Sequence, residues 1–169
     1  MPFKGLGDSK FVLNSEWGKP YITPIGSFVI NCGALENLSI QYLNVLAETE
    51  EEFAELSKKG FDNRVGKLIR LLKNRGVEND AEVIVRWKDV KDNLLPLRNT
   101  LCHNPITEVT SSEGVKTLCV LIHNSIKGDR KVKSQNFTPE NISKLADLVA
   151  EATNSLAELL EPLKSTDVN

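Results

Sequence analysis

The sequence predicts a mainly α-helical protein: an up-and-down bundle of four to five helices with a small β-hairpin inserted before the last helix. Three observations support this prediction. Most of the chain repeats apolar residues at helical spacing, Gly and Pro separate the periodic stretches, and one β-rich stretch lies within residues 106–123. The 169 residues show no internal repeat, so we expect a single domain around one core.

The composition limits the classes of function. Apolar residues make up 40% of the chain and charged residues 26%, which is typical of soluble globular proteins. The net charge of −2 argues against a domain that covers DNA through bulk positive charge, but it leaves room for a small phosphate site. The longest mostly apolar stretch, about residues 22–46, is too polar for a membrane span, and the first residues lack the apolar core of a secretory signal.

The cysteines indicate a reducing environment. Cys32, Cys102 and Cys119 are odd in number and widely spaced, and no CxxC pair occurs. We therefore expect neither a disulfide framework nor a zinc site, and the cytoplasm is the expected location. Because no carboxylate and histidine residues cluster at metal-ligand spacing, we also expect no metal and no cofactor.

The first helix is predicted over residues 25–47. Residues 1–24, rich in Gly and Pro, are expected to form an irregular N-terminal arm. Pro24 suits the first helical position, and Thr23 suits the N-cap. The apolar stripe of this helix comprises Phe28, Val29, Cys32, Leu35, Ile40, Leu43 and Leu46.

Glu36 lies on that apolar stripe, four residues after Cys32 and four before Ile40. A buried carboxylate needs a partner, because an unpaired buried charge costs a large free energy. Arg98 is the partner that would connect Glu36 to the candidate site described below. The alternative is a carboxylate at the edge of the stripe, solvated by water.

Two shorter helical stretches follow. An acidic, exposed helix is expected to continue over residues 48–59 and to end at Gly60. The next helix is predicted over residues 63–75, with Asp62 as its N-cap and Gly76 at its end. We expect its basic residues to form a solvated face, the alternative being a surface that faces RNA. They are Arg64, Lys67, Arg70, Lys73 and Arg75.

A longer helix is predicted over about residues 80–103. Pro96 lies inside it and is expected to kink it one turn before Arg98. Asn104 precedes Pro105, which disfavours the α conformation at Asn104 and ends the helix.

The remaining chain changes character. Residues 106–123 are rich in β-branched residues around a polar turn, which predicts the hairpin. The basic stretch 127–133 is expected to be a solvated loop, the alternative being a contact to a nucleic-acid backbone. Thr138 and Pro139 suit the N-cap and first position of a strongly amphipathic last helix, and residues 165–169 are expected to form a frayed tail.

Arg98, Asn99, His103 and Asn104, at the end of the predicted long helix, form the candidate site. Arginine is a permanent cation whose donors match a phosphate, and histidine exchanges a proton near neutral pH. The carbonyls at a helix C-terminus favour a protonated ring, which suits a general acid or an anion contact. We expect Arg98 to stabilise charge on a phosphate and Asn99 to orient His103 or hold a phosphate oxygen.

Helical geometry sets a condition on this site. Arg98 and His103 are five residues apart, which places them about 140° apart around an ideal helix. We therefore expect the two side chains to converge only if the helix loosens near its end or if a second copy of the chain completes the site.

The motif resembles that of the HEPN superfamily, a group of all-helical domains found in toxin–antitoxin, abortive-infection and CRISPR-linked nucleases. Arg98, Asn99 and His103 match the family pattern, with four residues between the arginine and the histidine. The His-Asn-Pro ending is similar to that of many small bacterial proteins of this kind. The resemblance covers a HEPN-like domain over residues 25–164, and the β-hairpin departs from the plain helical family.

The resemblance implies a metal-independent endoribonuclease that acts as a homodimer, with the Arg98 and His103 pairs of both copies in one cleft. It implies RNA as substrate, and a toxin–antitoxin or phage-defence system as the setting. Glu36 would correspond to the acidic residue that some members place near the motif, and Asn104 is a further supporting residue. The alternative is a non-catalytic HEPN-like module that serves as an antitoxin partner or a defence-complex subunit, in which Arg98 and His103 hold the helix end and the hairpin together.

Overall fold

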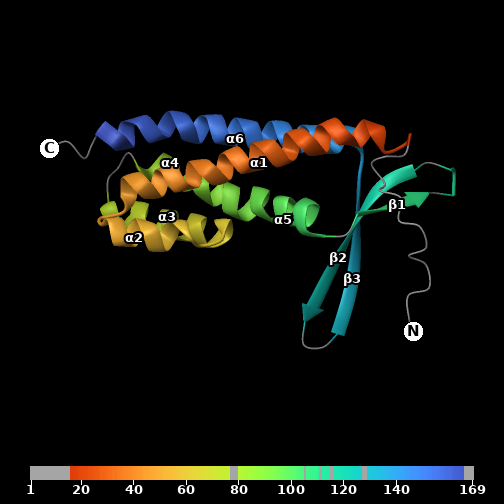
Figure 1. The fold of residues 1–169 in the computed structure, drawn as a ribbon, viewed down its shortest axis with the longest axis horizontal. Helices are drawn as coiled ribbons and strands as arrows, with labels where there is room; N and C mark the ends of the chain where they lie inside the picture. Colours follow the sequence, from red (N-terminus) through yellow and green to blue (C-terminus); the bar gives the residue numbers. More distant parts are fainter. Residues whose placement is uncertain are drawn as a thin grey trace.

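Two long helices, α1 (Lys19–Leu46) and α6 (Pro139–Ser165), lie side by side in the computed structural model (Figure 1). The structure describes residues 16–76, 80–104, 106–110, 112–114, 116–126 and 129–165. One buried and one part-buried hydrogen bond join the two helices. Tyr42 Oη donates to the Leu156 carbonyl at 2.6 Å, and Asn31 Nδ2 donates to the Ala146 carbonyl at 2.9 Å.

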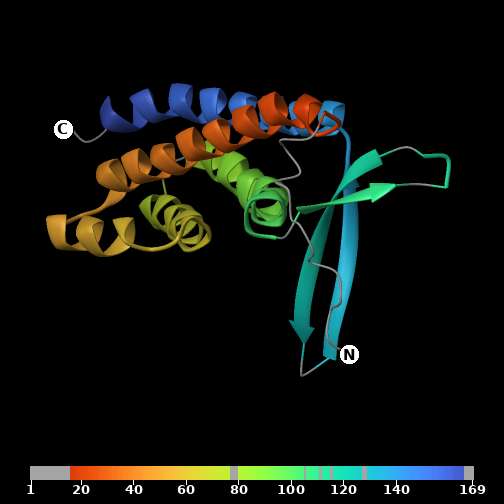
Figure 2. The same ribbon diagram turned by 45° about the vertical axis from the view of Figure 1, so that its right-hand side comes forward.

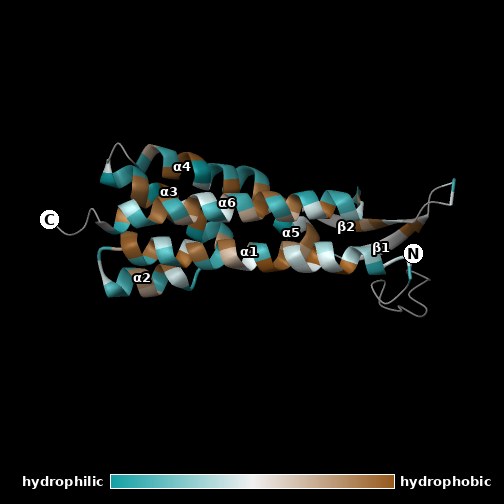
Figure 3. Cartoon of the chain, turned by 90° about the horizontal axis from the view of Figure 1, so that it is seen from above, coloured by the Kyte–Doolittle hydropathy of each residue, from teal (hydrophilic) through white to brown (hydrophobic). Residues whose placement is uncertain are grey.

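The shorter helices pack against this pair and enclose one apolar core. They are α2 (Glu50–Ser57), α3 (Phe61–Arg75), α4 (Asp80–Asp89), a π-helical turn (Val90–Leu94) and α5 (Leu95–His103). Figures 1 and 2 show α2, α3 and α5 below α1. Trp87 of α4 is fully buried and meets the Tyr42 ring edge-on at 5.3 Å between centroids. Seen from above, α1 and α6 alternate apolar and polar residues along their length (Figure 3).

An antiparallel sheet joins one end of the bundle. Its strands are β1 (Ile106–Thr110), β2 (Lys116–Ile126) and β3 (Asp129–Phe137), in the order β1-β2-β3. Only residues 116–120 of β2 pair with β1, so the rest of β2 pairs with β3 alone in a ribbon that extends away from the helices (Figures 1 and 2). Tyr21 Oη anchors the sheet to α1, because it donates to the Phe137 carbonyl at 3.1 Å and accepts from the Leu118 N–H at 3.3 Å.

The predicted fold class is confirmed: the described part of the chain is mainly helical, with a hairpin before the last long helix. The predicted start of the first helix is wrong. α1 begins at Lys19 with Pro20 in its first turn, so Pro24 lies inside the helix and residues 19–24 are not part of an arm. Tyr21, in the added first turn, is buried and hydrogen-bonded to β2 and β3, which favours the helix there although Pro24 lacks a backbone N–H. The rest of the expected arm lies outside the described residues, apart from a turn at 16–18.

The break between α1 and α2 was also missed. Ala47 is extended, and Thr49 Oγ1 accepts from the Glu52 N–H at 3.1 Å, while Glu52 Oε2 accepts from the Glu48 N–H at 3.0 Å. This reciprocal pairing starts a separate helix. Gly60, expected to end the acidic helix, is instead the residue before α3.

The ends of α3 and the basic stretch 127–133 differ in part from their predictions. Asp62 lies in the first turn of α3 rather than capping it, whereas Gly76 ends α3 in the left-handed conformation, as predicted. The stretch 127–133 is not simply a loop, because residues 129–133 belong to β3. β1 covers one edge of β2, and β3 pairs with the other edge. Most of the expected tail, residues 166–169, lies outside the described chain.

The Tyr42 hydroxyl provides a test of how α1 is held to α6. Tyr42→Phe removes a buried donor and leaves the shape of the ring unchanged, so we expect the free energy of unfolding to fall by about 1–2 kcal/mol. Urea denaturation followed by circular dichroism measures this change. Ser57→Ala, which removes an exposed hydroxyl bonded to the Ala54 carbonyl, is the control and should change it by less than about 0.5 kcal/mol. Equal stability of Tyr42→Phe and the unmodified chain would contradict the packing described here.

Candidate functional site

The candidate site lies at the C-terminal end of α5, which Arg98 links to Glu36 of α1, and a π-helical turn precedes α5. Within Val90–Leu94 the backbone is wider than an α-helix, and the Leu95 N–H bonds to the carbonyl of Val90, five residues back. Pro96, which follows shortly after, explains this π-helical turn. It has no N–H, and its ring would clash with the carbonyl of Asp92 in a regular helix. The predicted disturbance at Pro96 is therefore a π-helical turn that divides the long helix into α4 and α5.

Arg98 and His103 meet at the end of α5 within a single chain. Arg98 Nη1 lies 2.6 Å from His103 Nε2 and 3.1 Å from Asn99 Oδ1. α5 stays α-helical through His103, so the expectation that the helix end must loosen, or that a second copy must complete the contact, is wrong. The long arginine side chain bridges the angle, since side chains of a helix lean toward its N-terminus and the ring of the last residue leans back toward Arg98.

This contact defines the proton arrangement of the ring. A guanidinium carries only donors, so His103 Nε2 must be the acceptor, which places the ring proton on Nδ1. His103 and Asn99 are both exposed, whereas Arg98 is partly buried. The site thus holds a cation beside an imidazole nitrogen that has a free lone pair whenever Arg98 turns to another acceptor.

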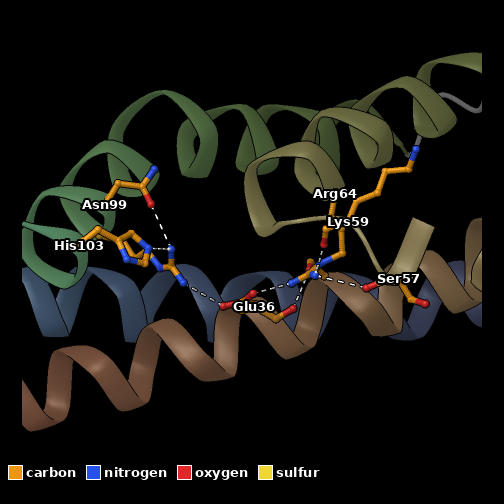
Figure 4. Close-up of polar contacts among 8 residues, drawn as sticks. Glu36, Ser57, Lys59, Arg64, Asn99 and His103 are labelled. Atoms are coloured by element: carbon orange, nitrogen blue, oxygen red, sulfur yellow. Dashed lines mark hydrogen bonds and ion pairs between the residues drawn. The ribbon is translucent and has the colours of Figure 1, made fainter. Parts of the chain in front are cut away.

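Glu36 of α1 joins this group from the other side. Its Oε2 lies 3.4 Å from Arg98 Nη2, and its Oε1 lies 2.8 Å from Arg64 Nη2. Figure 4 shows Glu36 between Arg64 on one side and Asn99 and His103 on the other. The expected pairing of Glu36 with Arg98 is present, and Arg64 is a second partner, which was not predicted.

Arg64 is buried, with 7% of its side chain exposed, so a solvated face was the wrong expectation for this residue. Its Nη1 donates to the carbonyls of Lys59, at 2.5 Å, and Ser57, at 3.4 Å, and its Nε donates to Ser39 Oγ at 3.1 Å. One feature of the sequence indicated that Arg64 is buried. It lies four residues before Leu68, and both belong to the buried stripe of α3.

Asn104 closes the helix end. Its Nδ2 donates to the carbonyls of Asn99, at 3.1 Å, and Thr100, at 3.0 Å, both in the last turn of α5. Its backbone is extended, and α5 ends at His103, as the Asn-Pro pair predicts. Asn104 therefore supports the site by holding the backbone of α5. Among the described residues, the hydrogen bonds of the Arg98 guanidinium go to Asn99, His103 and Glu36, not to Asn104.

Two cysteines flank Arg98. Burial raises the pKa of the Cys32 thiol on α1 to about 12, and burial also raises the pKa of Cys102 on α5, while the Arg98 charge opposes both shifts. Cys32 and Arg98 border a small cavity with apolar residues of α1, α3, the π-helical turn, α5 and α6. Arg98 thus borders an apolar cavity on one side, while its Nη1 contacts the exposed His103 ring.

Among the described residues, no group of three or more His, Cys, Asp and Glu side chains is placed to hold a metal ion. Within the same residues, no helix combines the length and the apolar character needed to cross a membrane. No family model matches the chain, and no curated protein or solved structure matches it either. The geometry of Arg98, His103 and Glu36 therefore carries the functional argument.

The environment of the cysteines predicts their reactivity. The thiolate is the reactive form, so a raised pKa together with burial should protect Cys32 from iodoacetamide at pH 8. We expect exposed Cys102 to be modified first, and the rate constant for Cys32 to be at most about one tenth of that for Cys102. Peptide mass spectrometry measures both rates, with urea-unfolded protein as the control in which they become similar. Equal rates in the folded chain would show that α1 and α5 do not shield Cys32.

Proposed function

We propose that the chain is a HEPN-like, metal-independent endoribonuclease that cleaves RNA at a site shared by two copies. The observation that carries the proposal is the 2.6 Å contact between Arg98 Nη1 and His103 Nε2 at an exposed helix end. It joins a phosphate-binding cation to a proton acceptor, which is the minimum that RNA cleavage requires when the substrate supplies its own nucleophile.

The reaction uses the 2′-hydroxyl of RNA. His103 Nε2 takes the 2′-hydroxyl proton, the 2′-oxygen bonds to the adjacent phosphorus, and the bond from phosphorus to the 5′-oxygen breaks. Arg98 leaves the ring for the non-bridging phosphate oxygens and stabilises the negative charge that grows in the transition state. The second copy's His103 ring, protonated on both nitrogens, gives its Nε2 proton to the 5′-oxygen, which leaves as a hydroxyl; that ring ends neutral while the ring that acted as base ends protonated. The products are a 2′,3′-cyclic phosphate and a 5′-hydroxyl.

The local charge supports anion binding despite the overall charge of −2. Two guanidiniums, those of Arg64 and Arg98, share the single carboxylate of Glu36, which leaves one net positive charge before His103 is counted. Asn99 Oδ1 accepts from Arg98 and keeps the guanidinium turned toward the exposed end of α5. A phosphate that approaches this end meets an uncompensated cation at short range.

The proposed activity belongs to a toxin–antitoxin or phage-defence system. The partners are RNA as substrate, a second copy of the chain, and an antitoxin or defence-system protein that neutralises it. Cys32, Cys102 and Cys119 are free thiols, which supports a cytoplasmic location.

Cleavage of single-stranded RNA in the presence of EDTA is the direct test. His103→Ala should lower the cleavage rate by about 10²- to 10⁴-fold, because it removes the proton acceptor. Arg98→Ala should lower it by about 10²- to 10³-fold through loss of charge stabilisation. Tyr42→Phe, whose lost hydroxyl bonds to α6 and to no residue of the site, is the control for general destabilisation and should retain its rate at a temperature where it stays folded. Intact RNA at high protein concentration, or cleavage that survives His103→Ala, would refute the proposal.

A second function is favoured by one observation: the Arg98 donors already have partners in Glu36, Asn99 and His103. In a non-catalytic interaction module these contacts would hold α5 against α1. Arg98→Ala should then lower the melting temperature by several degrees, at about 2–4 °C for each kcal/mol lost, with no activity to lose. Differential scanning calorimetry measures this, with Arg86→Ala, which breaks an exposed pair with Glu82, as the control. An unchanged melting temperature would contradict this structural role.

A further inference from the structure

We propose that Arg64 is a positioning residue, which acts through Glu36 to keep the Arg98 guanidinium aimed at His103. This inference deepens the proposed nuclease function and rests on it for its biological meaning. The geometric part concerns only the side chains of this chain, so it can be tested whether or not RNA is cleaved.

Arg64 is fixed in place by its surroundings. It is the most buried charged side chain of the group, and it donates to four acceptors: Glu36 Oε1, Ser39 Oγ and the carbonyls of Ser57 and Lys59. The two carbonyls lie at the C-terminal end of α2, where backbone acceptors lack helical partners. Moving Arg64 would remove its hydrogen bonds from one buried and three part-buried acceptors, so its guanidinium is the fixed end of the series of contacts from Arg64 through Glu36 to Arg98.

The two oxygens of Glu36 are unequal. Oε1 is held at 2.8 Å by buried Arg64, whereas Oε2 reaches Arg98 at 3.4 Å. Arginine and a carboxylate pair most strongly as a two-pronged fork, with two N–H groups on two oxygens. Arg64 occupies one of these oxygens, so Arg98 bonds to Glu36 through Nη2 alone. Its Nη1 is thereby left for His103 and Asn99.

Loss of Arg64 should free the Glu36 oxygen that Arg64 now occupies. A Glu36 carboxylate with both oxygens free would take Arg98 in the two-pronged arrangement and draw Nη1 away from the ring. The His103 ring would then lose the donor that keeps its proton on Nδ1. Arg64 thus matters to His103, although no hydrogen bond joins the two residues in the described structure.

The tautomer of His103 is the readout, measured by long-range ¹H–¹⁵N correlation at pH 8 on the full chain labelled with ¹⁵N-histidine. The chain has only two histidines, and a His123→Gln variant assigns the signals. We expect the Nδ1–H tautomer in the unmodified chain. Arg64→Met should give the mixed tautomers of an exposed histidine, whereas Tyr42→Phe, destabilised away from the site, should keep the Nδ1–H form.

A double-mutant cycle separates positioning from a general structural effect. Glu36→Gln should also lose the Nδ1–H bias, because a neutral amide holds Arg98 weakly, and Arg64→Met should add nothing in that background. If Arg64→Met does not fold, Glu36→Gln alone decides. Retention of the Nδ1–H tautomer in folded Arg64→Met or in Glu36→Gln overturns the proposal, as does a further change when the two substitutions are combined.

Cleavage kinetics then link the positioning to activity. Arg64→Met and Glu36→Gln should lower kcat about tenfold to hundredfold and change KM about twofold or less, because a misaligned group weakens the transition state more than substrate binding. A changed KM with an unchanged kcat would contradict a role in aiming Arg98. If the unmodified chain cleaves no RNA, the nuclease proposal fails, while the tautomer result still decides the role of Arg64.

Discussion

The interaction on which the site depends is a single carboxylate shared by two guanidiniums. Glu36 on α1 holds Arg64 of α3 through one oxygen and Arg98 of α5 through the other, so three helices distant in sequence meet at one side chain. Charges taken out of water are costly unless each is paired and hydrogen-bonded. Here the buried cation has four acceptors and the carboxylate has two cations, while the remaining positive charge faces the exposed end of α5.

The bundle places the net positive charge of Arg64, Arg98 and Glu36 near the exposed C-terminal end of α5. α1 and α6 form the long axis, and α5 ends beside them where the sheet begins, so His103 lies at the junction between the helices and the strands (Figure 1). The π-helical turn before Pro96 matters because it sets the rotation of α5, and hence the direction of Arg98, relative to α4. Asn104 then closes the last turn and keeps His103 at a regular helix end.

Local signals in the sequence predicted much of this arrangement. The stop at Gly76 and the N-cap at Thr138, whose Oγ1 accepts from the Asn141 N–H at 3.2 Å, depend on neighbouring residues and were visible in the sequence. Glu36 was recognisable because a carboxylate on an apolar stripe needs a partner. Arg64 was missed because a basic helix is normally solvated, and its acceptors come from a helix break that local spacing did not reveal. The convergence of Arg98 and His103 was underestimated because ideal angles ignore the reach of an arginine side chain.

The central claim is that His103 and Arg98 promote attack by the 2′-hydroxyl of RNA. Analysis of the product ends tests it most directly. A defined RNA is incubated with the protein in EDTA, and its fragments are examined by mass spectrometry beside an RNA that carries a single 2′-deoxy residue at the cleaved position. We predict fragments with 2′,3′-cyclic phosphate and 5′-hydroxyl ends, and no cleavage of the 2′-deoxy RNA at that position. Fragments with 3′-hydroxyl and 5′-phosphate ends, or cleavage of the 2′-deoxy RNA, would contradict the account.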